Sequence, residues 1–259
     1  MKVGPHGREK RNPTRMSSLF RRTYLSAVMA SMCFAQTKVT LSERLPTVEE
    51  QLQDHRILLD RSSVIDALQD PDGDVRALAA VKLANDNAVE AIPQIAGALR
   101  LEGLPEVQIQ MAVALAEMGD KAGNASLTAL CFSKTQSVTI RLGAAQNMLQ
   151  LHNEACFNAV LEIVQDASQH EQLGDALTVL SGFREVFKKD PPRVIDPMVL
   201  ALADPSASIR ISAAWSLGNL RAISSIPQLE FALANEHEEA VRAQMQLDLN
   251  ILKKASVAH

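Results

Sequence analysis

Aromatic residues are scarce in this sequence: they make up 3% of its 259 residues, with one Trp and one Tyr. The single Tyr, Tyr24, lies near the N-terminus, so the rest of the chain offers few stacking platforms for sugars or single-stranded bases. The sequence also lacks the phosphate-loop motifs G-x-x-x-x-G-K-[ST] and G-x-G-x-x-G, the esterase motif G-x-S-x-G and the zinc-protease motif H-E-x-x-H. We therefore predict no catalytic residue, no metal site and no cofactor.

Cysteine, glycine and proline are also few. The three cysteines, Cys33, Cys131 and Cys156, form no C-x-x-C pair, so neither a zinc ribbon nor a disulfide framework is indicated. Gly and Pro number 11 each beside 47% hydrophobic residues, a balance that favours a folded, helical protein. Lys and Arg total 26 against 30 for Asp and Glu, and this net charge of -4 gives no reason to expect a nucleic-acid partner.

The first forty residues differ in composition from the remainder. Eight basic residues face a single acid, Glu9, and a mildly apolar run follows from Tyr24 to Ala35. This order is typical of a signal peptide, so we predict that residues 1–40 are a leader and that the protein is exported, either periplasmic or extracellular. The alternatives are a disordered basic tail on a cytoplasmic protein, an organellar transit peptide, or initiation at Met16. The apolar run is shorter than the roughly 20 residues that cross a bilayer, so we predict no membrane span.

The remaining chain contains an internal repeat. The segment Val75–Leu83 recurs as Ile140–Met148 and as Ile209–Leu217, and weaker copies begin at Val107, Gln172 and Val241. The intervals between the six starting positions 75, 107, 140, 172, 209 and 241 are 32, 33, 32, 37 and 32 residues. A repeat of this length is typical of solenoids built from one supersecondary unit.

Each unit also contains an earlier apolar segment that is expected to form a helix. Ile92–Leu99 and Ile226–Leu233 show this most clearly, and both have proline in the first turn, where its missing N–H does no harm. The pairs Asp70-Pro71 and Asp204-Pro205 separate this helix from the next. The sequence therefore predicts an all-α fold, an α-solenoid of the armadillo/HEAT type with about six helical hairpins over residues 41–259.

The second helix of each hairpin has two faces that can be read from its spacing. Positions 75, 79 and 83 and their equivalents are apolar and fall on one helical stripe, which we expect to be buried. Positions equivalent to 78, 82 and 85 are mostly polar, and we expect them to line the concave side of the solenoid. The candidate protein-binding residues on this line are Gln110, Glu117, Asn147, Gln150, Ser216 and Asn219.

The 37-residue interval is the one place where the period breaks. The extra residues fall in Gly182–Arg193, which is aromatic and basic. Insertions in solenoids map to loops and often to binding faces, so Arg184 and Lys188 join the protein-binding candidates. The plainer interpretation is a segment that fills a kink, with Phe183 and Phe187 closing over the core.

An arginine recurs at the start of the second helices. A ladder of this kind could bind anions, but its fixed position favours pairing with the turn acid or stacking between units. The residues concerned are Arg76, Arg141, Arg210 and Arg242.

Two of the cysteines fall in consecutive first helices. Cys131 is near the end of one and Cys156 is near the start of the next. If these helices stack in parallel, the two residues are separated by roughly 9 to 13 Å along the axis, which is beyond the reach of a disulfide. We therefore predict two free thiols.

Together these features resemble a known repeat family. The Asp-Pro turn, the Val/Ile-Arg pair about six residues later, the Ala-Ala pair and the closing Leu are similar to the short HEAT-like repeats named after phycobilisome lyases, over roughly Asp60 to Lys254. The resemblance implies the solenoid fold and transfers no catalytic residue. We predict a non-enzymatic scaffold that holds another protein or peptide along its concave face, with the oligomeric state open. The alternative that the resemblance implies is a subunit of a bilin-lyase-like enzyme acting on a protein-bound chromophore.

Overall fold

The structure, a computed structural model, describes residues 44–257. The predicted leader at residues 1–40 lies outside this range. Every regular element within it is helical, which confirms the all-α class. The α-helices are α2 (Val48–Asp54), α3 (Arg61–Asp66), α4 (Gly73–Asn85), α5 (Ile92–Leu101), α6 (Pro105–Glu117), α7 (Lys121–Phe132), α8 (Val138–Gln150), α9 (Phe157–Gln165), α10 (Leu173–Leu180), α11 (Arg184–Lys189), α12 (Pro191–Ala201), α13 (Ala207–Leu220), α14 (Ile226–Asn235) and α15 (Glu239–Val257). Short 3-10 turns cover Ala67–Gln69 (η1), Val89–Ala91 (η2), Ala167–Gln172 (η3) and Ile223–Ser225 (η4).

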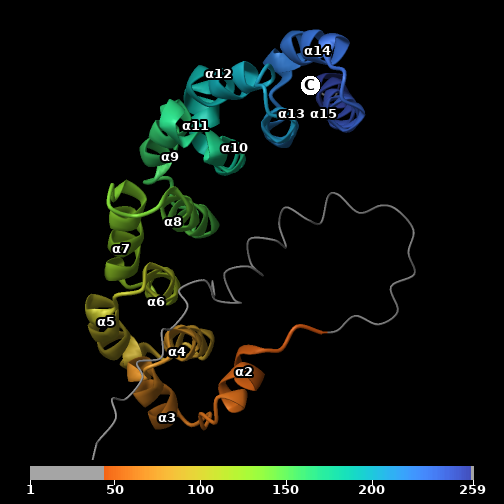
Figure 1. Ribbon diagram of the computed structural model, residues 1–259. Helices are drawn as coiled ribbons and strands as arrows, with labels where there is room; N and C mark the ends of the chain where they lie inside the picture. The colour runs from red at the N-terminus through yellow and green to blue at the C-terminus, as the bar shows by residue number, and fades with distance from the viewer. Residues whose placement is uncertain (1–43, 258–259) are drawn as a thin grey trace, which may run out of the picture.

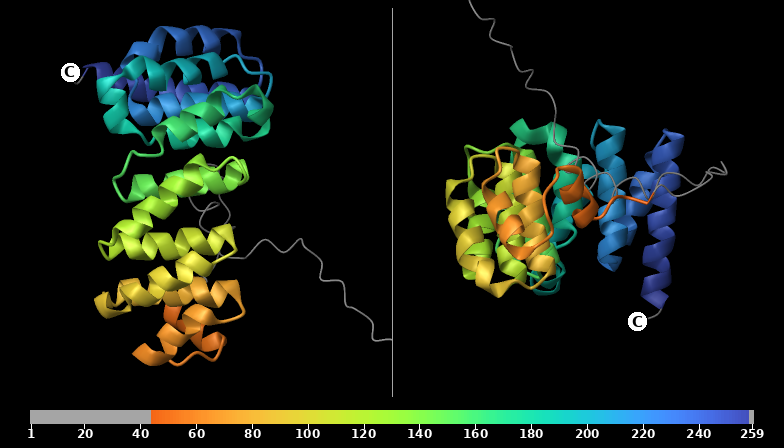
Figure 2. Two further views of the ribbon diagram at one scale, coloured as in Figure 1. Left: turned by 90° about the vertical axis from the view of Figure 1, so that its left-hand side faces the viewer. Right: turned by 90° about the horizontal axis from the view of Figure 1, so that it is seen from below.

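The helices form two layers that follow one arc (Figure 1). The outer layer consists of α3, α5, α7, α9, α12 and α14, and the inner layer of α2, α4, α6, α8, α10, α13 and α15. The two further views in Figure 2 show the same succession of helices along the curve. Each outer helix is followed by an inner one, so α3 to α15 make six hairpins, with α11 as an insertion. The predicted α-solenoid of about six hairpins is confirmed.

Local sequence explains where the helices begin. The side chains of Asp72, Asp120 and Ser137 accept hydrogen bonds from backbone N–H groups in the first turns of α4, α7 and α8. The helices α5, α6, α12 and α14 instead carry proline in their first turn, which the sequence predicts for α5 and α14. None of the helices in this part of the chain has the length and apolar character needed to span a membrane.

The hydrophobic core runs between the two layers along the described part of the solenoid. Val75, Ala79 and Leu83 are buried in α4, and their equivalents on α6, α8 and α13 are buried as well. The apolar stripe read from the repeat is therefore the buried one. Because each hairpin packs on the hairpins before and after it, the core has no internal boundary.

The insertion forms α11 and closes the core at the kink. Phe183 is fully buried and meets Phe157 edge to face, with ring centroids 5.4 Å apart. The guanidinium carbon of Arg193 lies over the Phe157 ring, 5.0 Å from its centre. Phe187 is half-buried against the same core. These contacts fit the kink-filling interpretation of the extra residues.

The repeated arginines join one unit to the next. Arg76 donates to the carbonyl oxygens of Asp70 and Pro71 and makes two hydrogen bonds with the carboxylate of Glu102. Arg210 repeats this arrangement with the carbonyls of Asp204 and Pro205 and the carboxylate of Glu236. The hydrogen bonds from Arg210 lower the pKa of Glu236 to about 2. These two arginines therefore contact the next unit through an ion pair, and backbone carbonyls of the turn, not the turn carboxylate, accept their other hydrogen bonds.

The prediction of two thiols is wrong, because Cys131 and Cys156 form a disulfide with their Cα atoms 5.9 Å apart. The prediction assumed outer helices stacked in register. In Figure 1, α7 and α9 instead follow one another along the arc, so that the end of α7 reaches the start of α9. Both cysteines are fully buried, and Nε of Arg141 donates to the carbonyl oxygen of Cys131 at 3.0 Å.

Gly123 allows α7 to pack closely on α6. A Cβ atom at this position of α7 would overlap the carbonyl oxygen of Ala112 and lie 2.5 Å from the backbone nitrogen of Ala116, both in α6. Since backbone atoms cannot rotate away, Gly123→Ala is expected to push the helices apart and lower the free energy of unfolding by about 2 kcal/mol. Urea unfolding followed by circular dichroism measures this change.

Gly97 provides the matched control for that variant. It lies inside α5, where an added Cβ would approach only the end of the Arg100 side chain, at 3.8 Å. Gly97→Ala is therefore expected to be neutral or to stabilise the protein by up to about 1 kcal/mol through helix propensity. Equal effects of the two substitutions would contradict the tight α6–α7 packing.

Candidate protein-binding face

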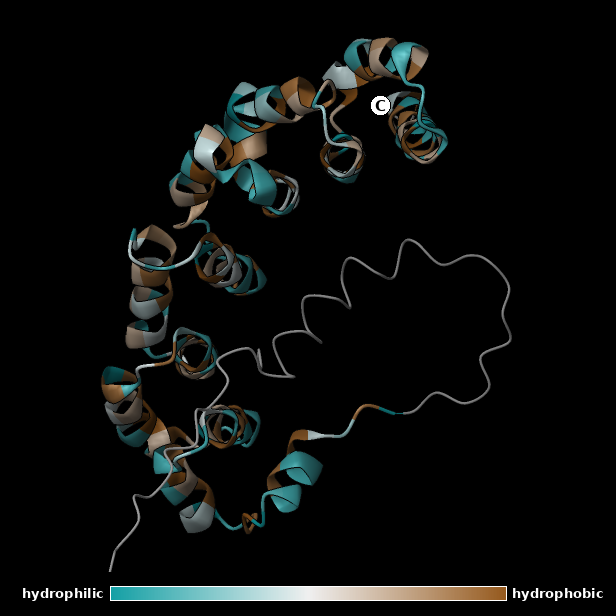
Figure 3. Cartoon of the chain, in the orientation of Figure 1, coloured by the Kyte–Doolittle hydropathy of each residue, from teal (hydrophilic) through white to brown (hydrophobic). Residues whose placement is uncertain are grey.

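The inner helices leave one face uncovered. Their buried side packs on the outer layer and their flanks pack on neighbouring inner helices, so the remaining exposed side faces the hollow of the arc (Figure 1). We call this line of side chains the concave stripe. In Figure 3 hydrophilic colour is prominent on the side of α8 that faces the hollow. The stripe consists of Glu106, Gln110, Val113 and Glu117 on α6, Thr139, Gln146 and Gln150 on α8, Asp175 and Thr178 on α10, Ser208, Ser212, Trp215 and Asn219 on α13, and Gln244, Leu247 and Ile251 on α15.

Several predicted residues lie on this stripe. Glu117 and Gln150 are exposed at the ends of α6 and α8. Gln110 is half-buried and lies two turns before Glu117 on the same face of α6. Asn219 is half-buried, and its amide donates to Oγ of Ser181 on the adjacent inner helix at 3.1 Å. Its role is therefore partly to join α13 to α10.

Two predicted residues lie off the stripe. Ser216 has no exposed surface, so the expectation that it contacts a partner is wrong. Asn147 occupies the equivalent position on α8, where it is half-buried and donates to the carbonyl oxygen of Gly143 in its own helix. At 100° per residue this position lies about 70° from the centre of the stripe, where the neighbouring inner helix covers it.

The position one residue earlier is the one that faces the hollow. It is occupied by Val113, Gln146, Thr178, Trp215 and Leu247, all partly or largely exposed. Repeat spacing alone does not distinguish this position from the one occupied by Ser216 and Asn147, because both fall near the polar face of the helix. The packing of neighbouring inner helices decides which of the two is exposed. Trp215, Leu247 and Ile251 therefore form an apolar end to a stripe that is otherwise polar except for Val113.

The stripe carries negative charge. Of the 26 basic residues eight precede residue 44, against two of the 30 acids, so the described part of the chain contains 18 basic and 28 acidic side chains. Glu106, Glu117 and Asp175 contribute carboxylates to the stripe on α6 and α10. A partner with basic and polar groups is favoured by this distribution.

Arg184 and Lys188 lie on α11 and not on the concave stripe. Both side chains are exposed, and Lys188 pairs with Glu185 at 2.6 Å. The backbone N–H of Glu185 donates to Glu154, in the loop before α9. The structure therefore separates these two candidates from the residues on α6, α8 and α13.

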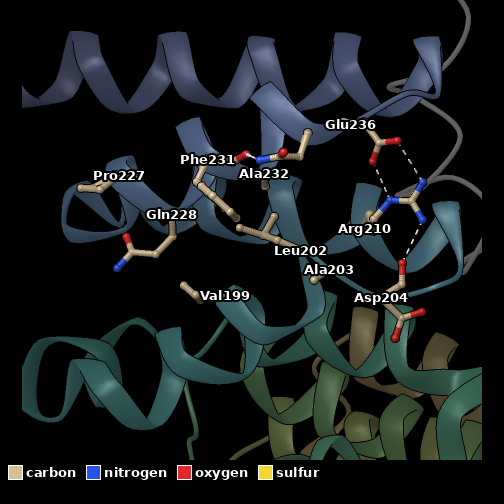
Figure 4. A pocket seen from close by; sticks show the side chains of 11 residues that line it. Val199, Leu202, Ala203, Asp204, Arg210, Pro227, Gln228, Phe231, Ala232 and Glu236 are labelled. Carbon is tan, nitrogen blue, oxygen red and sulfur yellow. Dashed lines mark hydrogen bonds and ion pairs between the residues drawn. The ribbon is translucent and has the colours of Figure 1, made fainter.

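A cavity of about 590 Å³ opens between the outer helices α12 and α14 (Figure 4). Its walls include Val199, Leu202 and Phe231, and at one end Arg210 is held by Glu236 and by the carbonyl of Asp204. The Asp204 carboxylate lies 3.0 Å from Nε2 of His170. The charged groups of the cavity are thus engaged with one another, and no nucleophile and base are brought together there.

Within residues 44–257 no group of three or more His, Cys, Asp and Glu side chains is placed to hold a metal ion. The histidines that precede a glutamate, His170 and His237, lie on different hairpins. Neither belongs to the concave stripe.

The comparison with protein families gives one match, to the PBS lyase HEAT-like repeat, over residues 209–235. This range covers α13 and α14 with the turn between them. The segment is thus similar to a single HEAT-like repeat of this type. It contains Arg210 and ends just before its partner Glu236. The comparison with curated protein sequences gave no significant match.

Solved structures with a similar course of chain share little sequence with this protein. One designed armadillo repeat protein has a TM-score of 0.47 at 19% identity, covering 74% of this chain and 100% of its own. Another, in complex with the peptide (KR)4, has a TM-score of 0.48 at 19% identity, covering 73% and 98%. The complex of CpcE and CpcF of phycocyanin lyase from Nostoc sp. PCC7120 has a TM-score of 0.37 at 16% identity, covering 84% and 100%.

Proposed function

We propose that this protein is a non-enzymatic scaffold built from HEAT-like repeats, that it holds another protein along its concave stripe, and that it works outside the cytoplasm. The observation that carries the proposal is the exposed face of the inner helices from α6 to α15, which is mostly polar and has carboxylates on α6 and α10. Apolar side chains gather at its other end, at Trp215, Leu247 and Ile251. A partner segment with basic groups followed by apolar side chains complements this order. Such a face is wide enough for an extended chain or a convex domain.

The disulfide supports the exported location. Disulfides persist in oxidising compartments and are rare in the cytoplasm, and Cys131–Cys156 is buried where reductants have little access. This observation adds to the leader-like order of charged and apolar residues in residues 1–40. Sequencing of the mature N-terminus, together with cell fractionation, tests the location. An intact N-terminus with reduced cysteines in the cytoplasm would contradict it.

Site-specific photocrosslinking in the native host tests the binding face. A crosslinker at Gln150 on the concave stripe is expected to capture a defined partner, whereas one at Ala129, exposed on outer helix α7, is expected not to capture it. The double variant Glu117→Lys with Gln150→Lys is then expected to weaken binding of that partner about tenfold or more, because it reverses the charge of exposed Glu117 and adds a positive charge at exposed Gln150. Its thermal unfolding should match wild type. Capture from Ala129 alone would move the interface to the outer layer.

The PBS-lyase type of the matched repeat supports a second candidate, a subunit of an enzyme that acts on a protein-bound chromophore. Absorption spectroscopy distinguishes it from the scaffold. Such a subunit is expected to bind a bilin and shift its visible spectrum, while a scaffold for protein partners leaves the spectrum of the free bilin unchanged. Capture of a chromoprotein by the Gln150 crosslinker would favour this candidate.

A further inference from the structure

Asp248 occupies an unusual place in the last helix. It lies in the middle of α15, with 2% of its surface exposed, and its carboxyl group packs on Gly218 of α13. A Cβ atom on Gly218 would overlap Oδ1 of Asp248 and lie 2.9 Å from its Cγ, so the carboxyl group presses directly on the backbone of α13. Oδ2 accepts a hydrogen bond from Nε2 of Gln244 at 2.7 Å, one turn earlier in α15.

No cation compensates this carboxyl group among the described residues. The charged groups on the elements packed against α15, and those of α15 nearby, are engaged elsewhere or exposed. Arg210 pairs with Glu236 and Glu238, Lys253 pairs with Glu230, Arg242 donates to backbone carbonyls, Arg221 is exposed at the end of α13, and η4 carries no charge. The buried carboxyl group therefore has one neutral hydrogen-bond donor and an apolar, backbone-lined surrounding.

The balance between the charged and neutral forms follows from this surrounding. Burial raises the pKa of Asp248 to about 6, although the hydrogen bond from Gln244 opposes the shift. In an unfolded or undocked chain the pKa of an aspartate is near 3.8. Because the pKa is raised in the folded state, the stability linked to this group is complete below about pH 4 and is lost as the pH rises through about 6.

We propose that α15 is a pH-sensitive end helix, seated firmly on α13 while Asp248 is protonated and loosened when its carboxyl group ionises at the face of Gly218. The consequence reaches the surface, because Leu247 and Ile251 of α15 stand on the concave stripe beside Trp215. Loosening α15 removes the apolar end of the stripe and leaves the acidic part on α6 and α10 in place. The proposal concerns this docking contact and stands whether or not the stripe binds a partner.

Hydrogen exchange of the full chain, measured by mass spectrometry and corrected for intrinsic rates, tests the proposal. Between about pH 4 and pH 7.5, opening of peptides from Glu239–Val257 is expected to rise about a hundredfold, which corresponds to the difference of about two pKa units between docked and free Asp248. Peptides from α8 serve as the internal reference for other pH effects. The variant Asp248→Asn keeps an acceptor for Gln244 but cannot ionise, so its α15 peptides are expected to follow the α8 reference.

An NMR titration and the variant Gly218→Ala test the proposal independently of Asp248→Asn. Titration of the Asp248 carboxyl carbon by NMR is expected to give a pKa near 6, and a value near 4 would overturn the proposal even if Asp248→Asn folded poorly. Gly218→Ala, which forces the carboxyl group out of its seat, is expected to open α15 at every pH. An Asp248→Asn protein whose α15 opens with pH as wild type does would show that another group controls the helix.

Discussion

Leu217→Asp is expected to unfold the C-terminal hairpins and to cost at least about 4 kcal/mol of the free energy of unfolding. Leu217 is fully buried on the apolar stripe of α13, between the outer layer and the neighbouring inner helices. The substitution removes the packed leucine and places a carboxyl group in a core with no partner for it. Urea unfolding followed by circular dichroism, with hydrogen exchange to locate the opened hairpins, measures the effect.

The matched control is Leu200→Asp on α12, the same chemical change at a leucine that is 77% exposed. This variant is expected to unfold within about 0.5 kcal/mol of wild type. Because contacts in a solenoid are between neighbours, Leu217→Asp should leave α4 to α6 protected. If the two variants unfolded alike, the assignment of the buried face would be wrong.

Removing the disulfide is expected to have the second largest effect. The bond closes a segment with a sequence separation of 25 residues. Restricting a loop of this length in the unfolded chain stabilises the native state by roughly 3 kcal/mol. The double variant Cys131→Ala with Cys156→Ala is therefore expected to unfold at lower denaturant concentration, with α7 to α9 opening first because the bond joins these two outer helices.

Reduction of the wild-type protein provides the control. A reductant should lower the stability of the wild type toward that of the double variant and leave the double variant itself unchanged. A wild-type protein that is indifferent to reductant after denaturation and refolding, and that retains two reactive thiols, would contradict the bond between Cys131 and Cys156.

The arginine network shows how much a repeat can reveal in advance. The recurrence of Arg76 and Arg210 at one position predicts pairing with the turn acid or stacking between units, and in the structure both pair with a glutamate of the next unit. Their acidic partners, Glu102 and Glu236, stand 26 residues later in both cases, so the same comparison of copies contains the signal for the pair. The comparison of copies could not predict that the arginines also donate hydrogen bonds to backbone carbonyls of the Asp-Pro turn, because every residue has a backbone carbonyl and the sequence does not mark which one accepts.

The sequence by itself determined the helices, their pairing into hairpins and the side that each inner helix buries. These features follow from periodicity along one chain, since spacing of apolar residues, proline positions and capping residues act within a few turns. Tertiary structure alone decided three further features. The tilt of successive outer helices brings Cys131 to Cys156, the rotation of the inner helices covers Ser216 and exposes Trp215, and the meeting of α13 with α15 buries Asp248 on Gly218. Each depends on the relative orientation of two packed helices, which is set by the fit of their side chains and which the periodicity of either helix alone does not contain.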